Sequence, residues 1–525
     1  MTESTRTVLT IARTEVLFRI RTLGALITIL VVAIGVYFIV PDISTGRTLI
    51  QVDNGRVFYT SAAVALGTAM FCTLFMSIIG FYVVGNAFRR DIITRTGFVI
   101  AATPVSDSRY ILGKFLGSAC YLSVIMLTCM VSSMVMFLIR GEGSLEPFVF
   151  LRIYLWLVLP TIAYCSAIAL AFEALPLLSG RFGDVLYFFV WGGLLGVSGA
   201  SIDNNFGAVW INLLDVVGIV PIIGFMRETF QTTSLSIGST SFNAAKAPIL
   251  LNDLPWSLSL IGQRMAALVL PIVFLALARS WFHRFNPTRI KLSARQSRKS
   301  ILGRINRLFK PATRLIAPLS SGKAASSASI PGAVRADLVA TLTLSPFAIV
   351  AIIVFACISL LVDTETLRAG LLPAIAIAVV IALADITTRD YASGMMSLLS
   401  TAPHLKKDYI LWKFASALVI VLAFTAIPIV RLIMSFPNSG ISLVIGTLLL
   451  AAAAVSGGVL TRSQKPFMAA FLMLLYITLN AKDVAFFDFM GIYGKSPATT
   501  QLGYAVVTFL LIALAHRKHA SRAAV

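Results

Sequence analysis

Two stretches of the chain decide its fold, because they align with each other without a gap. Residues 89–115 read RRDIITRTGFVIAATPVSDSRYILGKF, and residues 388–414 read TRDYASGMMSLLSTAPHLKKDYILWKF, at an offset of 299 (388 minus 89). Both copies contain an Arg-Asp pair, a proline, and a Tyr-Ile-Leu-x-Lys-Phe ending. This self-similarity predicts an internal repeat, with one copy in each half of the chain.

A shorter match extends the repeat toward the start of each half. Residues 12–17 read ARTEVL and resemble VRADLV at 334–339, at an offset of 322 (334 minus 12). A longer outer loop between the first two spans of the first half accounts for the larger offset. We therefore expect each half to contain six spans behind a short amphipathic segment, and an even number of spans makes the two repeats parallel.

The composition excludes an ordinary soluble domain. The chain has 525 residues, of which 58% are hydrophobic and 12% are charged, and its mean hydropathy is +0.90. Apolar runs long enough to cross a bilayer recur from one end to the other. The expected fold is an all-α polytopic membrane protein of about 12 transmembrane helices, placed near 23–40, 60–84, 115–139, 151–172, 184–201, 261–279, 345–362, 368–385, 414–434, 442–460, 466–480 and 501–515.

Basic residues set the expected domain boundaries and orientation. Twelve Lys or Arg and no Asp or Glu lie from Arg279 to Lys323, and ten of them lie within a linker at 286–333 that separates a first repeat at 1–285 from a second at 334–525. The positive-inside bias then places this linker and both termini in the cytoplasm. Twelve spans fit that orientation only if the apolar segment 206–225 is re-entrant or interfacial, as its internal Asp215 and Pro221 suggest.

The net charge of +21 does not indicate nucleic acid as a partner. Twelve of the cations lie in one cytoplasmic stretch, where they determine topology and attract anionic lipid headgroups. Membrane lipids are therefore the expected charged partner of the linker.

The repeated segment lies between spans two and three on the cytoplasmic side. It contains too few apolar residues to cross a bilayer, and it ends near a proline that cannot continue a helix interior. We expect short helices at 92–103 and 391–402. Each such helix either rests on the lipid headgroups or protrudes as a docking element that a soluble motor grips.

The first copy has the spacing R-D-x(5)-G, T-P-x(5)-Y-x-x-G-K, which resembles that of the permease subunit of ABC-2 type exporters. The second copy keeps the Arg-Asp pair, the proline, the tyrosine and the lysine, but has Ala402 in place of Thr103 and Trp412 in place of Gly113. The resemblance implies that 92–103 and 391–402 are coupling helices received by two ATPase domains, and that 7–22 and 334–343 are elbow helices. It also implies a set of ATPase-coupling residues, namely Arg90, Asp91, Gly97, Ile100, Thr103, Pro104, Tyr110, Lys114, Arg389, Asp390, Leu399, Pro403, Tyr409 and Lys413.

The resemblance implies a non-catalytic permease that exports an apolar or amphipathic substrate by alternating access, powered by two separate ATPase subunits. No G-x-x-x-x-G-K-[ST] loop occurs in the chain, so ATP hydrolysis is expected on another polypeptide. No catalytic, cofactor-binding or metal-binding residues are predicted, and the histidines, including His519, fall on cytoplasmic flanks. The expected location is a bacterial inner membrane.

Two other functions are alternatives that fit the sequence less well. A twelve-span secondary transporter also has two six-span halves and a basic central loop, but proton coupling needs carboxylates at mid-membrane, which the expected spans almost lack. An intramembrane transferase needs acid or base groups at one membrane face, and no such group of His, Asp or Glu is expected there. Charges within spans mark such pathways, and we considered Glu173 and Arg431. Arg431, near the outer end of span nine, is the candidate contact for an anionic substrate.

Overall fold

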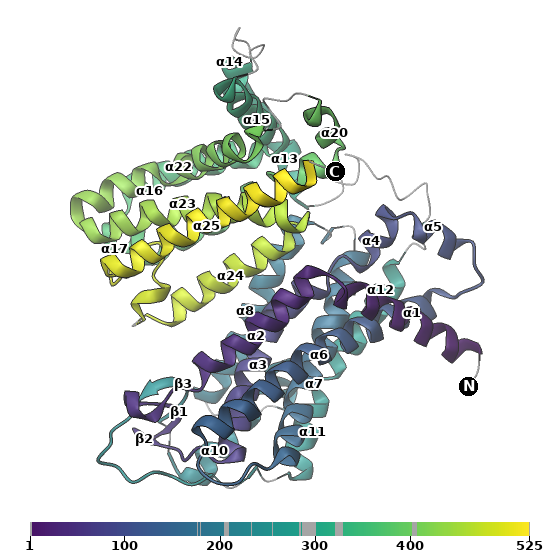
Figure 1. The fold of residues 1–525 in the computed structure, drawn as a ribbon, viewed down its shortest axis with the longest axis vertical. Coiled ribbons are helices and arrows are strands. Elements are labelled where there is room, and N and C mark those ends of the chain that lie inside the picture. The colour runs from purple at the N-terminus through teal and green to yellow at the C-terminus, as the bar shows by residue number, and fades with distance from the viewer. Residues whose placement is uncertain are drawn as a thin grey trace. The chain divides into compact units, whose positions relative to one another are not determined.

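The computed structural model describes residues 3–175, 177–178, 180–203, 209–232, 234–251, 253–254, 256–282, 285, 301–320, 329–401, 407–482 and 484–523 (Figure 1). The chain divides into two compact units. The first comprises Met1–Ser179 and Leu186–Ser293, and the second comprises Gly180–Val185 and Ala294–Val525. The main boundary therefore falls within the basic linker predicted from the charge pattern.

The first unit is built from helices α1 to α12. Their bounds are α1 Glu3–Ile20, α2 Leu23–Ile39, α3 Ser61–Val84, α4 Ala87–Ile93, α5 Thr96–Ala101, α6 Asp107–Arg140, α7 Pro147–Ala174, α8 Arg181–Asp203, α9 Val209–Leu214, α10 Ile219–Phe230, α11 Leu258–Ala266 and α12 Val269–Trp281. Helices α3 and α7 pack closely at the centre of the unit. Gly80 of α3 allows this close approach, because any larger residue would place its Cβ atom only 3.2 Å from Cys165 of α7. Most of α3 is buried, so this pair forms the core of the unit.

A small antiparallel sheet lies at one end of the first unit, in a structure that is otherwise built from helices (Figure 1). It contains β1 Arg47–Val52, β2 Gly55–Arg56 and β3 Leu235–Ser241, in the order β2-β1-β3. Its register pairs Gln51 with Arg56 and Ile50 with Ile237. The sheet thereby joins the loop after α2 to the distant segment after α10.

The structure has no spanning helix in the described part of 206–225. It forms α9 and α10 instead, and these helices are separated by a turn in which Gly218 has a φ of 84°. The Asp215 carboxylate accepts hydrogen bonds from the backbone N–H groups of Gly218, Ile219 and Val220, so it caps the start of α10. Asp215 therefore breaks the apolar run for a local structural reason.

The second unit contains the remaining helices. These are α13 Ile301–Leu308, η2 Lys310–Ile316, α14 Ala317–Ser320, α15 Ile330–Leu344, α16 Pro346–Leu361, α17 Thr364–Thr366, η4 Leu367–Leu371, α18 Leu372–Leu383, α19 Thr388–Ala392, α20 Met395–Ser400, α22 Tyr409–Ser435, α23 Pro437–Thr461, α24 Lys465–Asn480, η5 Ala485–Phe487 and α25 Ala498–Ala523. Part of the linker is thus helical. The Asn306 side chain bonds the backbone of Leu344 and Phe347, which holds α13 beside the junction of α15 and α16.

The long apolar helices are those of an integral membrane protein. Among the described residues, nine helices are long and apolar enough to cross a membrane, or up to eleven if each of two bent pairs counts as one span. The bends are 73° between α1 and α2 and 92° between α15 and α16.

Judged by length and composition, the spanning helices among the described residues number nine to eleven, which is fewer than the twelve predicted. Helices lie at all twelve predicted positions, and those at 261–279 and 368–385 belong to the longer helical segments Leu258–Trp281 and Thr364–Ala392. Three of the twelve are short: α2 has 17 residues, and α16 and α24 have 16 each. At 1.5 Å per residue they measure about 24–26 Å, which is less than a hydrocarbon core of about 30 Å. Hydropathy along the sequence located these helices, but it did not show that the bends after α1 and α15 shorten two of them.

Candidate functional site

Each half carries a helix–break–helix unit between its second and third spans. We name residues 87–101, which form α4 and α5, the first docking element, and residues 388–400, which form α19 and α20, the second docking element. The single helices predicted at 92–103 and 391–402 are wrong in their bounds. The reason is a left-handed residue at the same repeat position, Arg95 with a φ of 60° and Gly394 with a φ of 74°.

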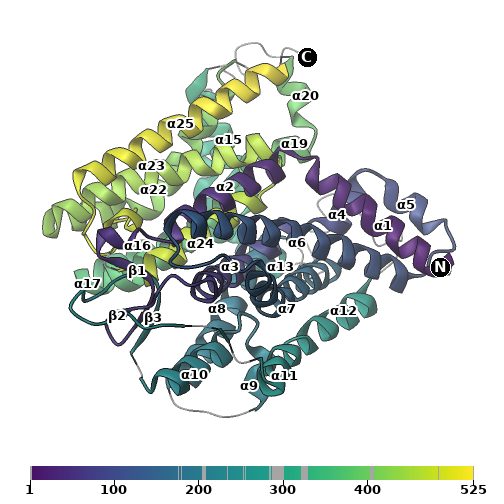
Figure 2. The ribbon, with the colours of Figure 1, turned by 60° about the horizontal axis from the view of Figure 1, so that its bottom comes forward.

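A buried ion network fastens the first docking element to α1, and α1, α4 and α5 lie together in both views (Figures 1 and 2). The carboxylate of Glu15 lies 2.8 Å from Arg19 Nε and 2.8 Å from Lys114 Nζ, and it also pairs with Arg90. Lys114 Nζ lies 2.7 Å from Asp91, which accepts a hydrogen bond of 2.6 Å from the Tyr110 hydroxyl. Lys114 therefore joins Glu15 of α1 to Asp91 of the first docking element.

The second half contains the same network. Lys413 Nζ lies 2.7 Å from Asp337 of α15 and 2.6 Å from Asp390 of the docking element. Arg389 pairs with Asp337, and the Tyr409 hydroxyl donates to Asp390 at 2.9 Å. These partners correspond residue by residue to the sequence alignment, including Asp337, which aligns with Glu15 at the offset of 322.

The charges in the first network are firmly set. Glu15 lies on α1, which is not one of the nine described helices that are long and apolar enough to cross a membrane by themselves, and its side chain is 1% exposed. Burial alone would raise its pKa, but Arg19, Lys114 and Arg90 outweigh burial and lower the pKa from 4.5 to about 2. Glu15 is therefore ionised at neutral pH, and a buried ionised group of this kind stays in place only while its partners do.

Span four of the first half also holds the docking element. The Glu173 carboxylate at the end of α7 accepts hydrogen bonds from the backbone N–H groups of Ala87 and Phe88, at 3.1 Å and 2.9 Å. It therefore caps the positive N-terminus of α4. This is a satisfied terminal charge, and it acts on the docking element itself.

The two networks differ in one respect. Arg19 donates to the carbonyls of Val83 and Val84 as well as to Glu15, and it thereby caps the end of α3. The second half has Thr341 at the position equivalent to Arg19, and the Oδ2 atom of Asp337 is buried without a hydrogen-bond partner in the described structure. Asp337 of α15 therefore pairs with two cations, Arg389 and Lys413, whereas Glu15 of α1 pairs with three.

An aromatic ring in or just after the last helix of each half packs on the tyrosine that bonds the docking-element aspartate. In the first half, Phe282 and Phe285 lie 5.4 Å and 5.5 Å from the Tyr110 ring, and a Cβ on Gly97 would lie 2.6 Å from Phe285. In the second half, the ring of His519 stacks on Tyr409 at 4.9 Å. Sequence reasoning missed both contacts and interpreted His519 only as part of a basic tail.

The predicted coupling residues divide into buried and exposed groups. Asp91 and Asp390 are only 7% and 8% exposed, and Tyr110, Tyr409, Lys114 and Lys413 are buried with them. The two Arg-Asp pairs of the repeat are therefore not exposed surface pairs. Through these buried contacts, Asp91 fastens the first docking element to α6, and Asp390 fastens the second to α22.

The remaining coupling residues lie on the docking elements or just beyond them. Ile100 and Leu399 are half-buried, and Ile100 packs against the aromatic cluster. Thr103 is half-buried and donates to the Ile100 carbonyl, Pro104 is exposed, and Pro403 lies outside the described residues. The most exposed apolar side chains of the two elements are instead Val99, at 68%, and Leu398, at 69%, which are equivalent at the offset of 299.

Arg431 has a structural role near the C-terminal end of α22. Its guanidinium donates to the carbonyl of Val362 at 2.7 Å and to that of Ser359, so it caps the end of α16. Arg140 of α6 bonds the carbonyls of Val40 and Tyr37 at the end of α2 in the same way. The hypothesis that Arg431 contacts an anionic substrate stays a prediction beside this structural role.

We expect Arg140→Met and Arg431→Met to lower the thermal unfolding midpoint of the purified protein to a similar extent. Each removes hydrogen bonds from a charged donor to carbonyls at a helix end, and such bonds contribute about 1.5–3 kcal/mol each. The measurement is thermal unfolding in detergent. An unchanged midpoint for Arg431→Met alone would show that Arg431 is not a cap.

Sequence reasoning also missed a charge inside a span. Arg264 of α11 is 2% exposed, and its guanidinium donates to the carbonyls of Asp215 and Leu157 at 2.8 Å each. It therefore ties α11 to α7 and to the turn before α10. The apolar residues on both sides of Arg264 hid it from a hydropathy window.

Comparison with known proteins identifies no relative. The chain matches no family model, no curated protein and no solved structure. Among the described residues, no group of three His, Cys, Asp or Glu side chains could hold a metal ion. The functional argument therefore depends on the two docking elements and the networks that hold them.

Proposed function

We propose that this chain is the permease component of an ATP-driven exporter of the ABC-2 type, with one ATPase docked on each half. The observation that carries the proposal is the duplicated network of elbow, docking element and third span. A fold without an external motor has no need to fix a short surface element to two helices by buried ion pairs in both halves. A permease does have that need, because its motor must move the spans through this element.

The geometry supplies a path for force in each half. A push on the first docking element reaches α6 through Asp91 of α4. Tyr110 and Lys114, which both lie in the first turns of α6, hold the Asp91 carboxylate. The same lysine holds Glu15, so α1 moves with them. Buried ion pairs have strict geometric requirements, and they therefore transmit displacement better than exposed ones.

The proposed topology has twelve spans in two parallel repeats, with both termini, the linker and both docking elements in the cytoplasm of a bacterial cell. In this topology α2, α16 and α24 complete the set of spans, and local thinning of the bilayer or flanking polar residues accommodate their shorter length. The proposed substrate is apolar or amphipathic, and the chain itself carries out no hydrolysis.

The testing experiment is purification of the chain from its native membrane in mild detergent. We expect an ATP-binding protein to co-purify, with two ATPase domains for each permease chain. The separated permease should not bind ATP. Saturable ATP binding by the pure single chain would contradict the proposal, as would transport that continues without any associated ATPase.

A further inference from the structure

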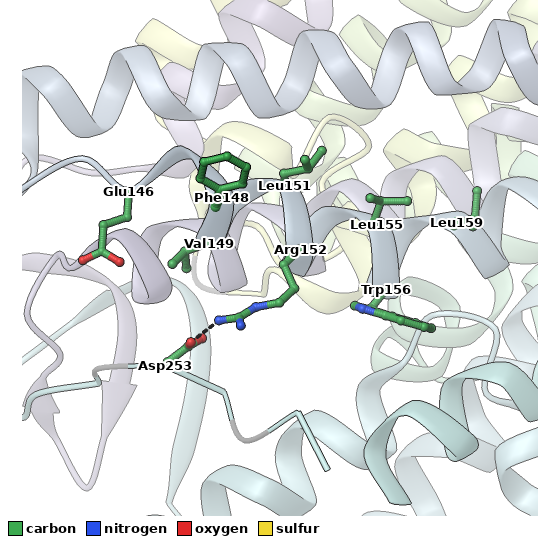
Figure 3. A pocket seen from close by; sticks show the side chains of 9 residues that line it. All are labelled: Glu146, Phe148, Val149, Leu151, Arg152, Leu155, Trp156, Leu159 and Asp253. Carbon is green, nitrogen blue, oxygen red and sulfur yellow. Dashed lines mark hydrogen bonds and ion pairs between the residues drawn. The ribbon is translucent and has the colours of Figure 1, made fainter. Parts of the chain in front are cut away.

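The first unit has an open groove of about 550 Å³ along one side of α7 (Figure 3). Two neighbouring stripes of side chains line it. One stripe contains Phe148, Leu151, Leu155 and Leu159, and the other contains Arg152 and Trp156 (Figure 3). Phe148 is 84% exposed and the three leucines are about 40% exposed, so this surface has no protein cover within its own unit.

The groove has the length of one membrane leaflet. From Phe148 to Leu159 the helix rises over 11 residues (159 minus 148), which is about 16 Å at 1.5 Å per residue. Half of a hydrocarbon core is about 15 Å. Because α7 is one of the spanning helices, an apolar chain is the expected filling of such a groove.

Charged groups are confined to one end of the groove. Arg152 pairs with Asp253 (Figure 3). The Arg152 guanidinium also lies 5.1 Å from the centre of the Trp256 ring. Glu146, just before α7, adds a second carboxylate, so this end carries one cation and two anions. Arg152 Nε and Trp256 Nε1 are buried donors without a hydrogen-bond partner in the described structure.

We propose that this groove binds a zwitterionic phospholipid with a primary-amine headgroup, from the outer leaflet. The acyl chain lies along Leu151, Leu155 and Leu159. The phosphate lies at the donors of Arg152, and the ammonium lies between Glu146 and Asp253. The net charge of −1 at this end repels an anionic headgroup, whereas a zwitterion satisfies both signs of charge.

The assignment to the outer leaflet rests on the topology proposed above, and it does not depend on an ATPase. In that topology the loop before α7 connects spans three and four on the outer side, so the charged end of the groove lies at the outer headgroups. Binding of the lipid can therefore be measured on the purified chain whether or not an ATPase is ever found.

The test is quenching of tryptophan fluorescence by brominated lipids in nanodiscs. Phosphatidylethanolamine or phosphatidylglycerol with dibrominated acyl chains is titrated in, and the signal of Trp156 is isolated as the difference from Trp156→Phe. We expect half-maximal quenching of Trp156 at a several-fold lower mole fraction of the ethanolamine lipid. Trp281 of α12, isolated in the same way, reports on bulk lipid and should be quenched equally by both.

A charge variant tests the basis of the preference. Glu146→Gln with Asp253→Asn changes only exposed or half-exposed groups, so it is expected to fold, and it changes the net charge at the groove end from −1 to +1. The preference of Trp156 should then reverse toward phosphatidylglycerol. Equal quenching of Trp156 by both lipids in the unaltered protein, or a preference for phosphatidylglycerol, would overturn the proposal.

Discussion

Replacing Lys114 by Met is expected to detach the first docking element from α1 and to destabilise the first unit by about 3–5 kcal/mol, the usual effect of removing one partner from a buried ion pair. Without the lysine, the carboxylates of Glu15 and Asp91 lose the cation that both of them contact. Lys413→Met should act in the same way on the second unit, since Lys413 is 1% exposed and holds two carboxylates. Thermal unfolding and the rate of tryptic cleavage within residues 87–109 measure the two effects.

The chain offers a matched control for this prediction. Lys246 also pairs with an aspartate, at 3.2 Å from Asp53, but both side chains are largely exposed. Lys246→Met should therefore cost at most about 1 kcal/mol. Adding Asp91→Asn to Lys114→Met should recover part of the lost stability, because it removes a carboxylate left without its cation. If Lys114→Met and Lys246→Met unfold at the same temperature, the buried network does not hold the docking element.

The double variant Val99→Asp with Leu398→Asp is expected to abolish recruitment of the ATPase while the permease stays folded. Both side chains are about two-thirds exposed, so a charge there costs the isolated chain little. At an interface, an apolar anchor contributes about 2 kcal/mol or more. Loss of both anchors should therefore reduce ATPase recovery in a pull-down by well over tenfold.

Leu308→Asp is the control, because Leu308 is an equally exposed leucine on α13, outside both docking elements. It should leave ATPase recovery unchanged. The single variants report whether the two halves contribute equally. Undiminished recovery with the double variant, in a protein of normal stability, would show that the exposed tips of the docking elements are not the seat of the motor.

The alignment at an offset of 299 predicted which residues are equivalent, and the structure gives equivalent residues equivalent partners. The alignment could not predict the partners themselves. Glu15 lies 75 residues from Arg90 and 99 from Lys114, and separations of that size carry no local signal. Within the sequence, only the helical spacing of Glu15 and Arg19 was visible, and that pair proves to be one part of the network.

The sequence indicates the break between the two short helices in the second docking element but not in the first. Gly394 marks it in the second copy, because glycine adopts a left-handed conformation without a steric cost. Arg95 stands at the same position in the first copy, where its side chain gives no such indication. The aromatic contacts near the end of each half could not be predicted for another reason. Phe282 and His519 stack on the equivalent tyrosines Tyr110 and Tyr409, but they are residues of different types.

Helices α6 and α22 are each fixed near both ends, by a lysine near the first end and an arginine near the second. Lys114 and Arg140 are 26 residues apart (140 minus 114), and Lys413 and Arg431 are 18 apart (431 minus 413). At 1.5 Å per residue the two anchored lengths are about 39 Å and 27 Å. The shorter length fits the thickness of a thin bilayer, whereas the longer one must tilt or extend beyond the acyl chains. The two anchored lengths differ by about 12 Å, so in the proposed topology α6 and α22 would meet one bilayer thickness with different tilts.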